Sequence, residues 1–477
     1  MSWRNLSSAF VWFSQTRIPP ILWICLLWFL LVVPAISIRE VHYEEGTTIG
    51  LARGAFEDGH WLTPFRYGVR FVERPVLISW LLGAVGTVTG SLPLWMARLP
   101  TVLAFLAGAG LVYWLVRQYA SIRAAMFSAI CFLISPMMLQ KTVTAEVDGV
   151  VSVLLFAGFV TWWIGHSRGS PNAARWLVLA IVLSAATLVK GPQPLGYFFI
   201  GVGSYLTLKR RWLELMSLTI CGVLSGSVAW GWYWTVYQPG DLALWFAHSR
   251  LGASKSVEAY FAEAGHFVVQ LLLEWLPGVL LVAPLAIDLA RRRFTGNRAL
   301  ALALFLYGGV CSVILVFWPK ARTRYAMPSV LAIAAAAGLA FDYLLVQQRK
   351  IIEIAQAVAA CLVTYALVVN WLIMPLASSS FQEKRRYGDY IALTIAQRPG
   401  TFYVTPEALD NQVLVYIQIP VRQASFDTIQ RVEPPFFALV TPAQEQLLRT
   451  SKGDSRTILH FSLHRAREAR FVEILQP

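Results

Sequence analysis

The chain has 477 residues, of which 57% are apolar and 14% are charged, and its mean hydropathy is +0.57. Soluble globular proteins carry about 25% charged residues, so this composition excludes a conventional soluble enzyme, a disordered chain and a coiled coil. The net charge of +14 does not indicate a nucleic-acid partner, because basic residues gather in short connections between apolar segments. The sequence therefore predicts an all-α protein that crosses a membrane many times.

Eleven apolar segments are expected to cross the membrane, since a helix needs about 20 apolar residues to pass the hydrocarbon layer. A further apolar segment, 77–90, is too short to cross comfortably, and we expect an interfacial helix there. The eleven expected spans are 19–37, 95–116, 124–139, 149–165, 176–190, 194–208, 214–234, 265–289, 299–318, 326–346 and 351–375.

The short connections between these spans indicate the orientation of the chain. Every second connection is basic and free of acidic residues, which is typical of cytoplasmic loops. These connections include the stretches 117–123, 168–175, 209–211, 291–298 and 349–350. The pattern predicts a multi-pass protein of the cell inner membrane, with a cytoplasmic N-terminus and a periplasmic C-terminus.

The character of the chain changes near residue 376, where charged and apolar residues begin to mix. Expected strands are 401–405, 413–417 and 436–440, and expected helices are 388–397 and 441–449. We therefore predict two domains, a transmembrane catalytic domain over 1–375 and a small periplasmic α/β domain over 376–477.

Acidic residues follow two of the expected spans on the outer side. Glu44 and Glu45 come after the first span, where one carboxylate can act as a general base and the other can raise its pKa. The alternative is that this pair only marks the water boundary. Glu146 and Asp148 lie two residues apart, so on a helix they would not share a face, and one of them is expected to face the site.

Basic residues on the outer side need a reason, because the positive-inside bias places them in the cytoplasm. Lys320, Arg322 and Arg324, next to Tyr325, are suited to hold a phosphate through charge-assisted hydrogen bonds. The alternative is that they bind anionic lipid headgroups. Lys190 precedes Gly-Pro at the end of a span, and it either joins the same site or extends harmlessly to the interface.

The order of these motifs resembles the GT-C glycosyltransferases that use polyprenyl-phosphate sugars, in the branch of the lipid A aminoarabinose and protein O-mannosyl transferases. The resemblance covers about residues 1–345. This chain departs from the family pattern in three places, since the family's leading Asp is Glu44, a tyrosine common three residues after the acidic pair is Thr48, and the first-loop Lys is Arg74. The matching stretches are Glu44-Glu45, Gly59-His60-Trp61, Glu73-Arg74-Pro75-Val76-Leu77, Asp148, Val189-Lys190-Gly191-Pro192 and Arg324-Tyr325 followed by Pro328.

This resemblance implies an integral-membrane glycosyltransferase that moves a sugar from an undecaprenyl-phosphate-like donor to a lipid A, polysaccharide or protein acceptor on the periplasmic face. Glu44 is the expected base, Asp148 a second candidate or acceptor-orienting residue, and Glu45 the tuning residue. Glu73 is a candidate ligand for a divalent metal, because carboxylates suit hard cations, although the sequence does not require a metal. The expected contacts to the donor phosphate are Arg74, Lys190, Lys320, Arg322, Arg324 and Tyr325.

Two other classes of function remain open on the sequence alone. A secondary transporter or flippase of an anionic lipid or metabolite would place ionisable residues near the bilayer midplane, often in repeated halves. A scaffold that binds membrane lipids would explain the basic loops but not the outer carboxylates. Because the ionisable residues gather at one surface and no repeat is evident, the sequence favours the enzyme.

Overall fold

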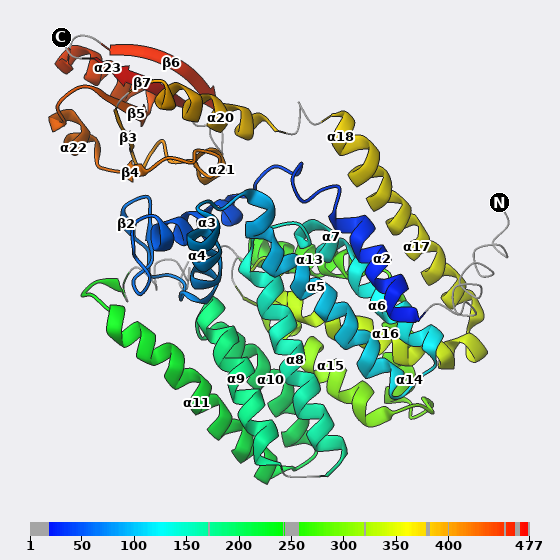
Figure 1. Cartoon of the computed structure of the whole chain (residues 1–477). Helices are drawn as coiled ribbons and strands as arrows, with labels where there is room; N and C mark the ends of the chain where they lie inside the picture. Colours follow the sequence, from blue (N-terminus) through cyan, green and yellow to red (C-terminus); the bar gives the residue numbers. More distant parts are fainter. Residues whose placement is uncertain are drawn as a thin grey trace.

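A computed structural model of the chain describes residues 19–169, 172–241, 243, 257–318, 321–377, 382–398, 400–452, 455–462 and 468–475. Figure 1 shows a large bundle of helices at one end and a small sheet with short helices at the other. Helix α3 and the hairpin of β1 and β2 lie between these two parts.

Most of the bundle consists of long apolar helices. Within the described residues, seven helices are long and apolar enough to cross a membrane, or eight if α13 and α14 form one span. The chain is thus a multi-pass membrane protein, but the expected number of eleven spans is not confirmed. The helices of the bundle are α2 (Pro20–Val32), α5 (Leu94–Arg117), α6 (Ile122–Ile134), α8 (Val147–Ser167), α9 (Ala173–Lys190), α10 (Gln193–Leu208), α11 (Trp212–Val236), α13 (Val257–Glu274), α14 (Val279–Ala290), α15 (Arg298–Val316), α16 (Met327–Gln347) and α17 (Arg349–Val368), which continues through a π-helical turn, η2 (Val369–Ile373), into α18 (Met374–Leu376).

Two of the expected spans are broken, which hydropathy alone does not predict. Segment 124–139 divides into α6 and α7 (Pro136–Lys141), because Pro136 disfavours a helical Ser135, whose ψ is 138°. Segment 265–289 divides into α13 and α14, which are bent by 106° at a break that contains Pro277. The prediction of one continuous helix over 265–289 was wrong.

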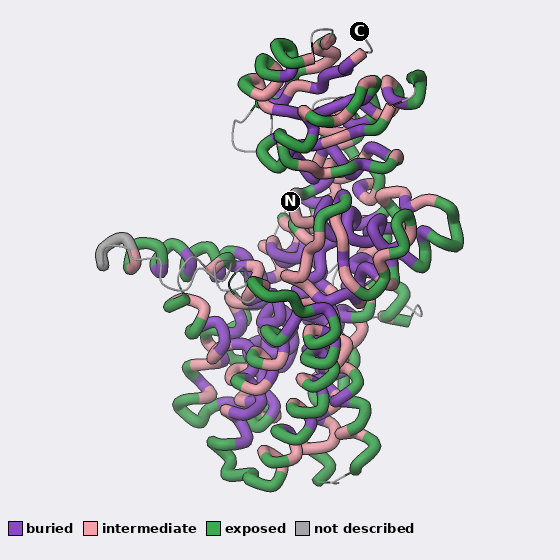
Figure 2. The backbone as a smooth tube through the Cα atoms, turned by 90° about the vertical axis from the view of Figure 1, so that its left-hand side faces the viewer, coloured by how far each residue is buried: buried purple, intermediate pink, exposed green. Residues whose placement is uncertain are grey.

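The buried core of the bundle lies around α5, α6, α8 and α16, and the outer helices carry many exposed positions (Figure 2). Large apolar side chains are exposed on α11 and on the segment after α17, including Trp234 at 75% and Leu376 at 78%. Exposed apolar surface of this extent is suited to contact with lipid tails rather than water.

Helix α3 (Tyr43–Phe56) lies between the bundle and the C-terminal sheet, and one of its faces is lined by glycines. Gly46, Gly50 and Gly54 are four residues apart and therefore share that face. A Cβ at Gly46 would lie 2.3 Å from the Asn411 carbonyl oxygen, and one at Gly54 would lie 2.2 Å from that of Phe65. Glycine at these positions allows both the hairpin and the C-terminal region to approach the helix. The hairpin is formed by β1 (Phe65–Arg66) and β2 (Val69–Arg70), and α4 (Leu77–Thr89) follows it.

The C-terminal region forms a five-stranded mixed sheet in the order β4-β3-β5-β7-β6. Strand β3 is parallel to β4 and β5, whereas β7 is antiparallel to β5 and β6. Its strands are β3 (Thr401–Val404), β4 (Val421–Gln423), β5 (Phe436–Val440), β6 (Ser455–Ser462) and β7 (Glu468–Ile474), and its helices are α20 (Glu383–Ala396), α21 (Asn411–Leu414), α22 (Phe426–Arg431) and α23 (Pro442–Lys452).

The expected strands at 401–405 and 436–440 and both expected helices are present in this region. The expected strand at 413–417 was wrong, because α21 and a turn occupy it. The Asp410 side chain accepts a hydrogen bond from the Gln412 backbone N–H at 2.9 Å and so caps the start of that helix. The division into a transmembrane catalytic domain over 1–375 and a periplasmic domain over 376–477 stays a prediction.

Candidate active site

The first turn of α3 places its two neighbouring carboxylates on different sides of the helix. Glu44 points into a cavity of about 180 Å³. Successive residues on a helix lie about 100° apart, and Glu45 is directed instead into the protein, where no part of its side chain is exposed. The expectation that both acids share one site was wrong.

Five separate stretches of the chain build this cavity. They are the start of α3, the loop before α4, the start of α8, the junction of α9 and α10, and the short 3₁₀ helix η1 (Thr323–Ala326). The lining residues are Glu44, Glu73, Arg74, Glu146, Val147, Asp148, Lys190, Gln193, Arg324 and Tyr325.

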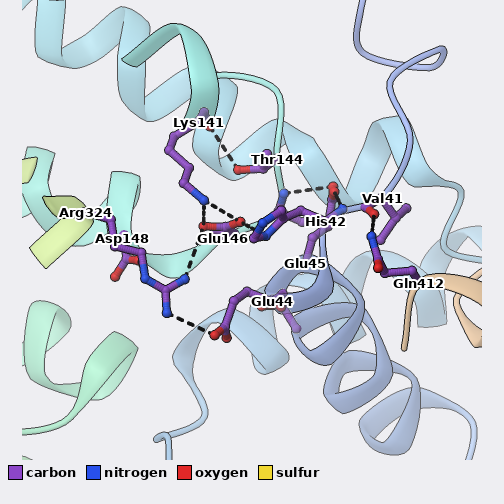
Figure 3. Close-up of polar contacts among 12 residues, drawn as sticks. Val41, His42, Glu44, Glu45, Lys141, Thr144, Glu146, Asp148, Arg324 and Gln412 are labelled. Atoms are coloured by element: carbon purple, nitrogen blue, oxygen red, sulfur yellow. Dashed lines mark hydrogen bonds and ion pairs between the residues drawn. The ribbon is translucent and has the colours of Figure 1, made fainter. Parts of the chain in front are cut away.

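Arg324 is the central cation of the cavity, and Figure 3 shows it between three carboxylates. Its Nη2 atom donates to Glu44 Oε1 at 3.0 Å. Its Nε atom lies 3.7 Å from Asp148 Oδ2, and its Nη1 atom lies 3.9 Å from Glu146 Oε2. One guanidinium therefore links acids from α3 and from the start of α8.

Two more cations complete the cluster. Arg74 forms an ion pair with Glu44, and Lys190 forms one with Asp148. Lys190 Nζ also lies 5.1 Å from the centre of the Tyr325 ring, within the range of a cation–π interaction. Helix α9 ends at Lys190, and Gly191 follows with φ of 85° and ψ of −157°, a backbone conformation open almost only to glycine, so the expected stop at Gly-Pro is confirmed.

The surroundings of Glu44 keep it ionised. Burial alone would raise the pKa of this carboxyl, but Arg74 and Arg324 outweigh burial and lower the pKa of Glu44 to about 2. Four carboxylates and three cations line the cavity, so its lining carries one excess negative charge. An anion that enters must therefore compete with the carboxylates for the same cations.

Glu146 is a site residue that the spacing argument did not select. It lies in the cavity beside Asp148, and its carboxylate accepts from Lys141 Nζ at 2.7 and 2.9 Å. His42 Nδ1 lies 2.7 Å from the same carboxylate. Burial would raise the pKa of Glu146, but the hydrogen bond with His42 and the charge of Lys141 lower it.

Glu45 holds the start of α3 in place through a fully buried ion pair with Arg98 of α5. Arg98 Nε donates to Glu45 Oε1 at 2.6 Å, and neither side chain is exposed. The Glu45 carboxylate also accepts from the backbone N–H groups of Ala145 at 3.0 Å and His42 at 3.1 Å. These bonds connect α3, α5 and the approach to α8, and so position Glu44.

We expect Arg98→Ala to lower the free energy of unfolding by about 3–5 kcal/mol, because it leaves the Glu45 charge buried without its partner. The thermal midpoint of the purified protein in detergent measures this effect. Arg117→Ala, at the exposed end of the same helix, is the matched control and should change the midpoint little. An equal, small shift in both variants would show that the buried pair does not hold the site together.

Part of this sequence matches a family profile and curated transferases. The profile of the dolichyl-phosphate-mannose-protein mannosyltransferase family matches residues 73–234. The undecaprenyl phosphate-alpha-4-amino-4-deoxy-L-arabinose arabinosyl transferase of Erwinia tasmaniensis is 25% identical over 180 residues, which cover 37% of this chain and 32% of that protein. The protein of the same name from Edwardsiella ictaluri is 27% identical over 191 residues, covering 39% and 33%. The chain spans about a third of the length of these curated relatives.

The likeness in three dimensions extends much further than the likeness in sequence. ArnT from Cupriavidus metallidurans in the apo state matches with a TM-score of 0.70 at 17% identity, over 95% of this chain and 97% of that one. The same protein bound to undecaprenyl phosphate also gives 0.70, at 16% identity, over 96% and 98%. The chain has the GT-C glycosyltransferase fold. The fold expected from the order of the motifs is thereby confirmed.

Within this GT-C fold, seven residues that the sequence selected meet in one cavity, namely Glu44, Glu73, Arg74, Asp148, Lys190, Arg324 and Tyr325. Arg322 does not join them, because it is exposed and precedes η1. Lys320 lies outside the described residues. Lys141 and His42 contact Glu146 without lining the cavity, and Gln193 lines it. None of these three belongs to the stretches that resemble the family motifs, so the resemblance did not select them.

The candidate metal site at Glu73 finds no support in the described side chains. Among the residues that the structure describes, no three His, Cys, Asp or Glu side chains are placed to hold a metal ion. Glu73 lines the cavity but is not part of such a group there. The carboxylates of Glu44 and Asp148 are paired with arginine and lysine instead, and the reaction proposed below uses no metal.

Proposed function

We propose that the protein is a membrane glycosyltransferase that moves a sugar from a polyprenyl phosphate to a lipid A, polysaccharide or protein acceptor. The observation that carries this proposal is the single cavity in which Glu44 and Asp148 meet Arg74, Lys190 and Arg324. The names of the curated relatives and the bound undecaprenyl phosphate of ArnT support the same donor class.

The proposed reaction is a single displacement at the sugar. The acceptor hydroxyl oxygen forms a bond to the anomeric carbon while its proton passes to Glu44. The bond between the anomeric carbon and the phosphate oxygen breaks, and its electron pair leaves with the polyprenyl phosphate. Arg74, Lys190 and Arg324 stabilise the charge that develops on this leaving group, and Tyr325 donates a hydrogen bond.

Donor binding would also make Glu44 a stronger base. Arg74 and Arg324 both form ion pairs with Glu44, which makes it a weak proton acceptor because an effective base has a pKa near the working pH. A phosphate that takes over these arginines leaves Glu44 with fewer positive neighbours, so its pKa rises towards its usual range. Asp148, paired with Lys190, is the second candidate base or orients the acceptor.

Transfer itself tests the proposal directly. A donor labelled in its sugar, such as undecaprenyl-phosphate-linked aminoarabinose, is incubated with the purified protein in detergent and with candidate acceptors. Appearance of label on an acceptor, together with release of undecaprenyl phosphate, supports the enzyme. A transporter or a lipid-binding scaffold would move or bind the donor without breaking the bond at the anomeric carbon.

We further propose that the protein lies in the cell inner membrane with a cytoplasmic N-terminus, so that the cavity and residues 376–477 face the periplasm. The basic connections support this orientation. In a background without native cysteines, Thr450→Cys should react in intact spheroplasts with a membrane-impermeant thiol reagent. Thr295→Cys, which is also exposed but lies in the basic connection after α14, should not react. The opposite labelling would reverse the orientation.

A further inference from the structure

A second cavity, of about 510 Å³, lies where helix α3 and the β1–β2 hairpin meet the C-terminal sheet. Its volume falls within the range of small-molecule sites. Helix α3 and the β1–β2 hairpin form one side, and the segment that ends in β4 forms the other. The two sides are joined where the Gln423 backbone N–H donates to the Tyr67 carbonyl oxygen at 2.7 Å.

Three polar atoms on the residues that line this cavity have no hydrogen-bond partner within the described structure. They are Arg53 Nε, the Tyr67 hydroxyl and Gln423 Oε1. Arg53 is only 6% exposed and Tyr67 only 7%. Buried polar groups are almost always hydrogen-bonded, so three orphans around one cavity indicate a ligand that supplies their partners.

The Arg53 side chain is held at its other end, where Nη1 donates to the Ile417 carbonyl oxygen at 2.6 Å. The orphan Nε lies 3.7 Å from Glu57 Oε1, which is within ion-pair range but too far for a hydrogen bond. The Arg53 side chain is therefore held between its own helix, α3, and the C-terminal region.

Tyr67 is held in a conformation that tyrosine rarely adopts. It has φ of 54° and is followed by Gly68 with φ of 80°, which together make the two-residue turn between β1 and β2. Such turns favour asparagine or aspartate before glycine, and strained residues of this kind concentrate at functional sites. The tyrosine ring packs in the hydrophobic core of the C-terminal sheet. Its hydroxyl lies beside Gly50, where a Cβ would come within 3.3 Å.

The charges around this cavity balance, unlike those of the catalytic cavity. Glu57 and Asp58 are matched by Arg53 and Arg422, so the site favours a neutral polar ligand over a phosphate. The orphan atoms offer one N–H donor, one amide acceptor and one hydroxyl that can do both. A sugar ring satisfies all three, since each of its hydroxyl groups donates one hydrogen bond and accepts two.

We propose that this cavity binds a sugar unit of the acceptor, apart from the hydroxyl that reacts. This role rests on the proposed transferase function. Arg53 lies nine residues after Glu44 on the same helix, which separates the two positions by about 14 Å along its axis. The acceptor would then be a saccharide of more than one unit, either lipid-linked or part of a polysaccharide, and would reach along α3.

Two substitutions remove the orphan oxygens and keep the packing. Tyr67→Phe retains the ring, and Gln423→Met retains the length of the side chain. Binding of methyl hexosides, glucosamine and chitobiose to the full-length protein in detergent is measured by saturation-transfer difference NMR without any donor. We expect at least one of these sugars to bind, and each variant to bind it about 3–10-fold more weakly, the usual effect of one lost hydrogen bond.

Stability separates this role from a purely structural one. Because the removed atoms have no partner within the described protein, neither variant should lower the thermal midpoint. Tyr390→Phe, on the exposed surface of α20, is the matched control and should leave sugar binding unchanged. The proposal fails if none of the sugars binds, if both variants bind as well as the native protein, or if they unfold at lower temperature.

The two proposals can fail separately. Arg324→Ala, which alters the catalytic cavity, should leave sugar binding intact. Sugar binding that depends on Tyr67 and Gln423, in a protein that transfers no label, would keep this site and reject the transferase. In an active enzyme with a saccharide acceptor, Tyr67→Phe should raise the KM for that acceptor and leave kcat nearly unchanged.

Discussion

Arg324→Ala should weaken donor binding by about 10–150-fold, the equivalent of about 1.5–3 kcal/mol for a charge-assisted hydrogen bond. The physical reason is that Arg324 contacts Glu44 and lies within 4 Å of Asp148 and Glu146. Its removal takes away a proposed phosphate contact and also leaves three carboxylates facing one another. Arg324→Lys should recover only part of the affinity, because lysine lacks the planar pair of donors that arginine offers.

Arg322→Ala is the matched control for this prediction. Arg322 is two residues earlier and is exposed outside the cavity, so its loss should change donor binding and transfer rate little. Donor affinity is measured by titration of the purified variants with undecaprenyl phosphate, and transfer is measured separately. Equal effects of the two substitutions would favour the alternative in which this cluster binds lipid headgroups.

The sequence predicted which charged residues meet in the site better than it predicted their local geometry. Glu44, Asp148, Lys190 and Arg324 were selected because each is a charged residue near the outer end of an expected span, where charge is costly without a function. Arg74 was selected by the resemblance to the family motif. The structure brings all five to one cavity. This part was predictable because the alternation of spans places every second connection on the same side of a membrane.

The remainder depended on local geometry that residue spacing does not give. The argument that Glu146 and Asp148 cannot share a face assumed a helix through both. Glu146 instead lies before α8 in extended backbone, with φ of −97° and ψ of 144°, so both side chains reach the cavity. Similarly, the separation of Glu45 from Glu44 depends on Arg98, a buried arginine of α5, which no motif marked.

Glu44→Gln should lower turnover by about 10²–10⁴-fold, the usual contribution of a positioned general base. Glutamine keeps the size and polarity of the side chain but cannot take the proton of the acceptor. The same change removes the negative charge that pairs with Arg74 and Arg324. Donor binding should therefore stay equal or become tighter while turnover collapses.

Three further carboxylates provide controls for this assignment. Asp148→Asn, Glu146→Gln and Glu45→Gln are compared with Glu44→Gln in initial rate and in donor affinity. Near-normal turnover in Glu44→Gln, with collapse in Asp148→Asn, would move the base to Asp148. Loss of donor binding in every variant would mean that these acids maintain the cavity rather than catalyse the reaction.

The dependence on pH tests the coupling between donor binding and Glu44. Arg74 and Arg324 lower the pKa of this carboxyl to about 2, so it loses its charge only when the pH falls towards that value. If the donor phosphate takes over Arg74 and Arg324, the pKa of Glu44 rises in the complex and its charge is lost at a higher pH. The pH profile of kcat reports the pKa of Glu44 in the complex, and that of kcat/KM reports its pKa in the free enzyme. The fall of kcat on the acid side should therefore occur at a higher pH than the fall of kcat/KM. Coincident acid limbs would show that the arginines stay on Glu44 throughout the reaction, and the release of the base by the donor would then be rejected.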